Sequence, residues 1–177
     1  TLPPDAPAAP ESGADAPTWS NRCSDRRRED FTVSERPLQG IRVLDLTNVL
    51  AGPFACHQLA HLGADVIKVE TLAGGDLARQ LGADPELNRR KMGVSFLAQN
   101  AGKRSITIDL KHPSGKAVFR TLVRTARVLV ENFRPGVMDR LGLGYRALLE
   151  RNPTLIYCAI SGFGQDGPLR DLPAYDQ

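Results

Sequence analysis

The 177-residue sequence is poor in several features that mark specialised classes of protein. Aromatic residues make up 6% of it, and its lysines and arginines are scattered rather than gathered in a stripe, which argues against a nucleic-acid partner. No run of about 18 uncharged apolar residues occurs, so the sequence predicts no membrane span. The formal net charge is only +3 and hydrophobic residues make up 41%, which is an ordinary composition for a soluble globular protein.

Cysteine is also scarce. The three cysteines, Cys23, Cys56 and Cys158, stand far apart and form no CxxC pair. This spacing is not typical of a disulfide framework or a zinc site, and it fits a reducing compartment. We therefore expect scattered core thiols in a cytoplasmic protein, or in a mitochondrial one if the source is eukaryotic.

Common catalytic motifs are missing or incomplete. There is no GxSxG nucleophile elbow. His57 and His61 are four residues apart on a predicted helix, but Gln58 stands where a zincin needs glutamate, so we predict two polar helix positions and no metal site. The segment 162–167 spells GxGxxG after a strand, but Pro168 follows where a dinucleotide fold needs a helix. A tight turn that brings backbone close to a ligand is the favoured interpretation, and a dinucleotide site is the weaker alternative.

The composition changes near Pro37. Residues 1–36 contain five of the thirteen prolines, seven acidic and five basic residues, and little apolar periodicity. Such a segment buries too little apolar surface to offset its conformational entropy. We predict a disordered tail over residues 1–36 and a folded part over residues 37–177.

The folded part alternates between strand and helix patterns. Pro53 and Pro113 stand at predicted first helical positions, and Gly63 follows the end of the first helix. The predicted strands cover residues 41–46, 66–69, 105–110, 127–130 and 155–160, and the predicted helices cover residues 53–62, 113–126, 137–141 and 145–151. This order predicts an α/β fold with a mainly parallel sheet and flanking helices.

Parallel strands place their following loops at one edge of the sheet, where ligands bind in folds of this class. Basic and amide side chains flank two of the predicted strands, and the helix starts at Pro53 and Pro113 add backbone donors. The side chains of this group are Lys103, Arg104, Lys111, Asn132, Arg134 and Arg140. Together they suit a polyanionic small molecule such as a nucleotide phosphate.

Several ordered motifs then resemble one family. PLQGIRVLDLT from Pro37, LAGP from Leu50 and LGADVIKVE from Leu62 resemble the opening of family III CoA-transferases. KRSI from Lys103, VENFRPG from Val130, LGLGY from Leu141 and SGFGQDGP from Ser161 continue the resemblance in order over residues 37–177. The resemblance implies a Rossmann-like large domain, incomplete in this chain, that binds coenzyme A as substrate and carries no covalently bound cofactor.

The family's chemistry implies roles for particular positions. An aspartate attacks an acyl-CoA thioester, a mixed anhydride forms, and CoA passes to a second, small carboxylic acid. The resemblance places that aspartate in a segment after Gln177, with Tyr175 and Asp176 as neighbours of the active site, so we expect this chain alone to be inactive. The implied CoA-binding residues are Leu50, Ala51, Ile108, Lys111, Asn132, Phe133, Arg134 and Arg140.

Two departures and two alternatives accompany the resemblance. Thr71 and Pro173 replace an arginine and a lysine of the formyl-CoA transferase pattern, which suggests a different acyl substrate. Alpha-methylacyl-CoA racemases share these motifs but use a histidine where Tyr175 stands, and tyrosine, with a pKa of about 10, is a poor base at neutral pH. A non-catalytic CoA-binding module is the other alternative.

The resemblance also implies an oligomeric state, because the full-length family forms interlocked homodimers.

Overall fold

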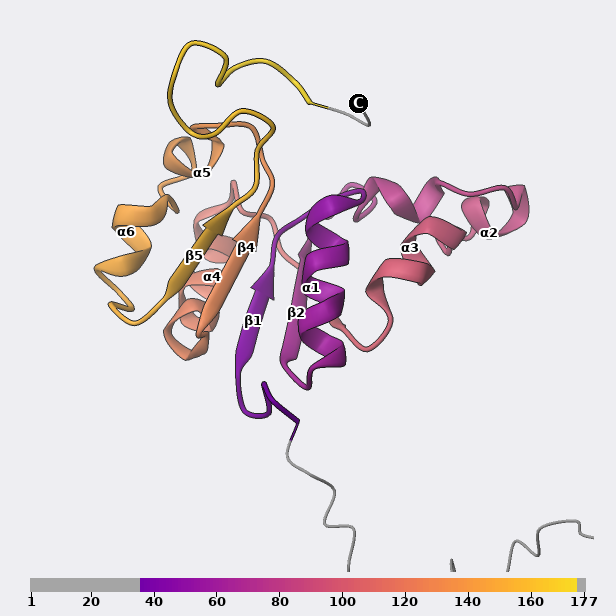
Figure 1. Cartoon of the computed structure of the whole chain (residues 1–177), viewed down its shortest axis with the longest axis horizontal. Helices are drawn as coiled ribbons and strands as arrows, with labels where there is room; N and C mark the ends of the chain where they lie inside the picture. Colours follow the sequence, from indigo (N-terminus) through magenta and orange to yellow (C-terminus); the bar gives the residue numbers. More distant parts are fainter. Residues whose placement is uncertain (1–35, 175–177) are drawn as a thin grey trace, which may run out of the picture. The chain divides into compact units, whose positions relative to one another are not determined.

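Five parallel strands form the sheet, in the order β3-β2-β1-β4-β5 (Figure 1). They are β1 (Arg42–Asp45), β2 (Asp65–Glu70), β3 (Arg104–Thr107), β4 (Val128–Glu131) and β5 (Ile156–Ala159). The structure is a computed structural model that describes residues 36–174, so nearly all of the predicted tail and both Tyr175 and Asp176 lie outside the described residues. The sheet confirms the predicted α/β class.

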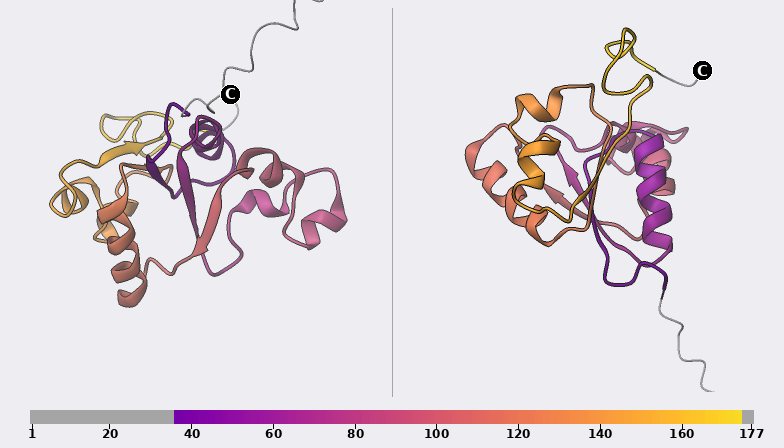
Figure 2. Two further views of the ribbon diagram at one scale, coloured as in Figure 1. Left: turned by 90° about the horizontal axis from the view of Figure 1, so that it is seen from below. Right: turned by 60° about the vertical axis from the view of Figure 1, so that its left-hand side comes forward.

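Helices cover both faces of this sheet (Figures 1 and 2). Helix α1 (Ala51–His61) lies on one face, where Val43, Val66 and Cys56 form a buried cluster. The other helices that flank the sheet are α4 (Pro113–Thr125), α5 (Val137–Arg140) and α6 (Tyr145–Leu149). They pack on the opposite face, where the larger core includes Leu44 and Phe119. Val43 and Leu44 therefore serve opposite faces, as the two-residue period of a strand requires.

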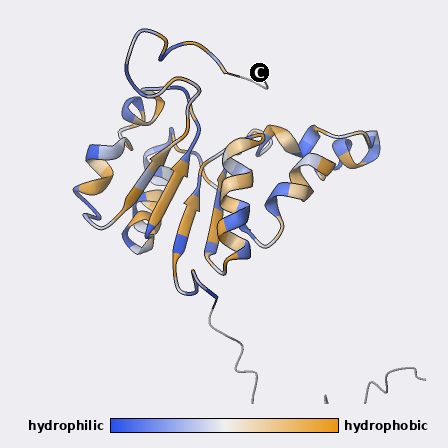
Figure 3. Cartoon of the chain, in the orientation of Figure 1, coloured by the Kyte–Doolittle hydropathy of each residue, from blue (hydrophilic) through white to orange (hydrophobic). Residues whose placement is uncertain are grey.

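The central strands β1, β2 and β4 are largely buried and contain short apolar runs (Figure 3), whereas the edge strands β3 and β5 are more exposed. Such runs are typical of a parallel sheet covered by helices on both sides. No helix within residues 36–174 combines the length and the apolar character needed to cross a lipid bilayer.

Three short helical segments between β2 and β3 were not predicted from the sequence. They are η1 (Leu77–Gln80), α2 (Pro85–Arg89) and α3 (Val94–Asn100). Asp76 and Asp84 cap the first two, because each carboxylate accepts hydrogen bonds from backbone N–H groups of the first turn. The predicted strand 105–110 also ends early, at Thr107, because the chain turns toward α4.

The strand order creates a switch point between β1 and β4. The chain leaves β1 toward β2 on one side, and leaves β4 toward β5 on the other side. Loops at the carboxyl ends of β1 and β4 therefore diverge to opposite faces and leave a crevice between them, which is where open α/β sheets bind their ligands.

Candidate functional site at the carboxyl edge of the sheet

Asn132 joins the two loops that meet at the switch point. Its side-chain oxygen accepts a hydrogen bond from Asn48 N (2.8 Å), and its side-chain nitrogen donates to Asn48 O (2.8 Å). Asn48 follows β1 and Asn132 follows β4, so this amide bridges two segments 84 residues apart. An aspartate would lose the donor and a leucine would lose both groups. The predicted site residue Asn132 therefore shapes the crevice through both loops.

The loop after β4 carries the predicted residues Phe133 and Arg134. Phe133 is partly buried against the core, and its backbone N–H donates to Glu131 Oε2 (2.8 Å). Tyr157 on β5 donates its hydroxyl to the other carboxylate oxygen of Glu131 (3.3 Å). Burial raises the pKa of the Glu131 carboxyl despite these hydrogen bonds. Burial, and then the nearby Glu131, also raises the pKa of Tyr157.

A cavity of about 300 Å³ opens beside this loop. Arg134, Glu131 and Tyr157 line it together with Tyr145 and Gln165. The rings of Tyr145 and Tyr157 meet edge to face, with centroids 5.9 Å apart. Sequence reasoning missed these tyrosines and Glu131, although Glu131 directly follows the predicted strand 127–130 and so belongs to the edge where ligands bind.

Arg140 lies near the same loop. A Cβ atom added to Gly136 would lie 3.1 Å from Arg140 Nη1, so the guanidinium rests against the Gly136 backbone. Gly136 has φ +77° at the start of α5, a conformation that favours glycine. Arg134 and Arg140 are both exposed, and they place two cationic groups at the end of β4.

Leu50 and Ala51 stand on the other side of the crevice, at the start of α1. Both are exposed, and Leu50 is 47% exposed. Val49 before them has φ +70°, which is strained for a β-branched residue. Asp76 holds this strained peptide, because its Oδ1 accepts a hydrogen bond from Val49 N (2.9 Å). Backbone strain held in place by its surroundings is a feature of ligand-binding loops.

A buried network of charged side chains supports the β1 loop from below. Lys68 Nζ donates to Thr47 O (2.8 Å) and lies 2.8 Å from Asp76 Oδ2. Lys103 Nζ donates to Asp45 Oδ2 (2.8 Å) and also to a backbone carbonyl of α1 and an amide oxygen of α3. These residues hold the loop that carries Leu50 and Ala51, and sequence reasoning missed the network.

The network corrects the predicted group of strand-end cations. The Lys103 side chain is 1% exposed and paired with Asp45, so it does not face a ligand. Arg104 is exposed but pairs with Asp65 at the first residue of β2, at the amino edge of the sheet. Lys103 precedes β3 and Arg104 is its first residue, and the start of a parallel strand lies at the edge opposite to the binding crevice.

Glu70 extends the network toward the loop after β2. Its carboxylate accepts hydrogen bonds from Arg79 Nε and Nη2 (2.7 Å each), from Ser105 Oγ (2.6 Å) and from Asp76 N (2.9 Å). Burial disfavours the ionised carboxylate, but these donors, Arg79 first, outweigh burial and lower the pKa of Glu70 to about 2. Glu70 thereby fixes Asp76, which in turn holds Val49.

Ile108 and Lys111 lie at the far side of the sheet, after the edge strand β3. The Ile108 side chain is buried in the core, so only its backbone is available to a ligand. Lys111 is exposed just before α4. Three strand spacings separate β3 from β4, a distance of about 14 Å. The structure therefore does not bring Lys111 next to Asn132, and only an extended ligand could contact both.

The remaining motifs have local roles. His57 and His61 hydrogen-bond to each other through their Nε2 atoms (2.9 Å). Within the described residues there is no cluster of three or more potential ligands that could hold a metal ion. Gly164 and Gly167 have positive φ values of +89° and +83° in an exposed turn. Of the cysteines predicted to be core thiols, Cys56 is buried but Cys158 is exposed, and Cys23 lies outside the described residues.

Comparisons with known proteins identify the relatives of this chain. The family model of CoA-transferase family III matches residues 38–177. A succinate–glutarate CoA-transferase from Agrobacterium fabrum is 51% identical over 153 residues, which cover 83% of this chain and 38% of that enzyme. An acetyl-CoA:oxalate CoA-transferase from Acetobacter aceti is 50% identical over 140 residues, which cover 79% of this chain and 35% of that enzyme.

A solved structure shows the same fold. A hypothetical protein (Rv3272) from Mycobacterium tuberculosis superposes with a TM-score of 0.72 at 44% identity, over 80% of this chain and 38% of that one. The chain thus spans little more than a third of the length of these relatives. The match over residues 38–177 shows that the chain belongs to CoA-transferase family III.

Proposed function

We propose that this chain supplies the CoA-binding part of an enzyme that moves CoA from an acyl-CoA donor to a small carboxylic acid. The observation that carries the proposal is the crevice at the β1–β4 switch point, where Asn132 ties together two loops that carry exposed candidate CoA contacts. Relatives named for succinate, glutarate and oxalate support small carboxylic acids as the substrate class.

The exposed groups divide naturally between the parts of CoA. The guanidinium groups of Arg134 and Arg140 form two-pronged hydrogen bonds that match phosphate oxygens. Leu50 and Ala51 offer apolar contact at the start of α1 for the less polar arm of the cofactor. Lys111, about 14 Å away along the sheet edge, reaches a distant phosphate of the same extended molecule.

The proposed reaction is a covalent exchange. An aspartate carboxylate attacks the thioester carbonyl, the C–S bond breaks, and the CoA thiolate leaves to give an acyl–aspartyl anhydride. The thiolate then attacks the aspartyl carbonyl, which releases the first acid and leaves CoA on the aspartate as a thioester. The second acid attacks this thioester to form a new anhydride, and the thiolate then attacks its acyl carbonyl to give the new acyl-CoA and the free aspartate. Exclusion of water from the crevice conserves the thioester free energy.

CoA binding is tested by calorimetric titration of the purified protein. Arg140→Ala and Lys111→Ala should each raise the dissociation constant for CoA by about tenfold, the usual cost of a lost charged hydrogen bond. Arg89→Ala, at an exposed position on α2, is the matched control and should leave binding unchanged. Unchanged affinity in both site variants would show that these assignments are wrong.

The covalent step is tested separately. The protein is incubated with succinyl-CoA, quenched with hydroxylamine, and digested for peptide mass mapping of modified aspartates. We expect no labelled aspartate within residues 1–177, because the resemblance implies that the nucleophile is not among them. A label on Asp176 would overturn that expectation while supporting the anhydride route. Exchange of succinate for glutarate or oxalate without any trapped aspartate would contradict the route itself.

A further inference from the structure

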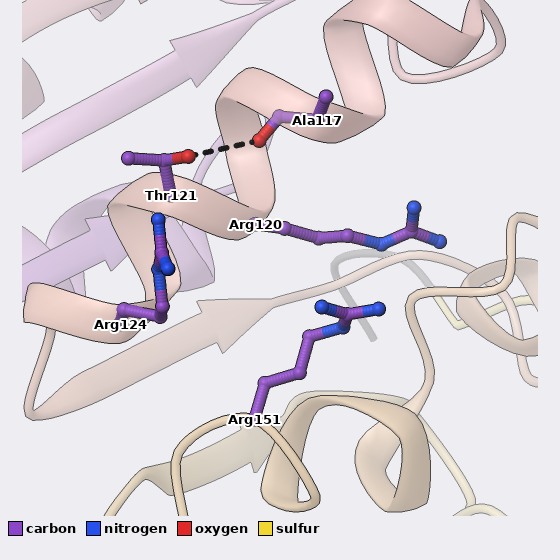
Figure 4. A pocket seen from close by; sticks show the side chains of 5 residues that line it. All are labelled: Ala117, Arg120, Thr121, Arg124 and Arg151. Carbon is purple, nitrogen blue, oxygen red and sulfur yellow. Dashed lines mark hydrogen bonds between the residues drawn. The ribbon is translucent and has the colours of Figure 1, made fainter.

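Three arginines gather on the surface of the α4 side of the sheet. Arg120 and Arg124 are one turn apart on α4, and Arg151 follows α6. Together with Ala117 and Thr121 they line a cavity of about 260 Å³ (Figure 4). In Figure 4 the side chains of Arg120 and Arg151 extend in the same direction, and the Arg124 guanidinium turns toward Thr121.

The cavity lies away from the carboxyl-edge crevice. Helix α4 has 13 residues and is about 20 Å long, and its first turn follows the loop after β3. Arg120 and Arg124 occupy its second half. Thr125, next to Arg124, accepts a hydrogen bond from Arg42 Nη1 (2.9 Å) at the first residue of β1. The cavity therefore sits toward the amino edge of the sheet, and none of its arginines is a candidate CoA contact.

The positive charge in this cavity is not neutralised within the described part of the chain. No carboxylate of residues 36–174 lies within ion-pair distance of Arg120, Arg124 or Arg151. Arg120 Nε is buried and has no hydrogen-bond partner, and Arg120 Nη2 makes only a long bond to Gly142 O (3.4 Å). A buried guanidinium N–H without an acceptor is unfavourable. The three guanidinium groups also carry the same charge, so they repel one another.

We propose that Arg120, Arg124 and Arg151 bind a phosphate group. A phosphate dianion supplies several acceptor oxygens, which suits a cavity lined by three arginine side chains. A single carboxylate from an acidic protein partner offers only two oxygens and one charge. The cavity volume is below the range of about 300–1,000 Å³ that holds a whole small-molecule ligand, so it fits a phosphate group, either free or at the end of a larger metabolite.

Calorimetric titration of the purified protein with inorganic phosphate, at constant ionic strength, tests the proposal. Arg120→Gln and Arg151→Gln should each weaken binding by about tenfold or more, as expected for the loss of charged hydrogen bonds. Arg120→Lys should give a smaller loss of affinity, because lysine keeps the positive charge but lacks the paired N–H donors of the guanidinium group. Arg146→Gln, on α6 but outside the cavity lining, is the matched control and should change binding by less than about twofold.

Further titrations distinguish between possible ligands. Methyl phosphate that binds as tightly as inorganic phosphate supports a phosphomonoester, and much weaker methyl phosphate binding supports the free anion. Phosphate binding that is lost in Arg134→Ala or Arg140→Ala but kept in the cavity variants would overturn the proposal, because it would place the phosphate in the CoA crevice. Equal losses in Arg146→Gln and the cavity variants, no saturable phosphate binding, or preference for a glutamate-rich peptide would also overturn it. Circular dichroism confirms that each variant is folded.

Discussion

Replacement of Glu70 by glutamine should remove a large part of the acid sensitivity of the fold. The Glu70 carboxyl is 6% exposed and accepts four hydrogen bonds, and its pKa falls from 4.5 to about 2. At about 1.4 kcal/mol per tenfold change in the ionisation constant, the ionised carboxylate stabilises the fold by about 3 kcal/mol. The folded-state pKa is depressed, so this contribution is complete above about pH 5 and is lost as the pH falls toward 2.

Urea unfolding at pH 7 and pH 3 measures this contribution. The native protein should lose about 2 kcal/mol through Glu70 between these two pH values, because its unfolded chain is protonated at pH 3 while its folded carboxylate is still mostly ionised. Glu70→Gln should be less stable than the native protein at pH 7 and should lack that part of the pH dependence. Glu150→Gln, at an exposed glutamate, is the control. An equal loss of stability on acidification in the native protein and in Glu70→Gln would refute the reasoning.

Three further changes probe the same framework. Lys103→Met should destabilise the fold by about 3 kcal/mol in urea unfolding, because it leaves the buried Asp45 carboxylate with only the more distant Lys68 Nζ (4.0 Å) as a cationic partner, and adding Asp45→Asn should recover part of that loss. Gly115→Ala should lower the thermal midpoint, at a cost of about 1–3 kcal/mol, because a Cβ atom at this position would overlap the Asp109 carbonyl. Burial raises the pKa of Cys56 to about 12, so iodoacetamide at pH 8 followed by peptide mass mapping should find Cys158 modified and Cys56 intact until the protein is unfolded.

The strand and helix order was predictable because its signals are local. Pro113 begins α4 in the structure, and Gly63 follows α1, as expected from the preference for proline at the first helical position and glycine past the last. The segment from Leu77 to Asn100 was missed for a related reason. Its helices are only four to seven residues long, so each shows little of a helical period, although α5 and α6, which are as short, were predicted.

The site was predictable only on its exposed side. Asn132, Arg134 and Arg140 follow a strand, and the rule that loops of parallel strands share one edge is enough to bring them together. Lys103 was misplaced because the same rule was applied to a residue that precedes its strand. Its partner Asp45 is 58 residues away, and only the three-dimensional arrangement reveals that pairing.

The buried half of the site accounts for the position of its exposed half. Val49 adopts a strained positive φ, which two hydrogen bonds in series stabilise. Glu70 accepts a hydrogen bond from Asp76 N, and the Asp76 side chain accepts one from Val49 N. Lys68 holds the neighbouring Thr47 carbonyl from the same side. Buried charges are costly unless each has its partners, so they are best understood here as supports for one loop conformation. Leu50 thus follows a loop whose supporting charges are held in ion pairs, Lys68 with Asp76 and Glu70 with Arg79.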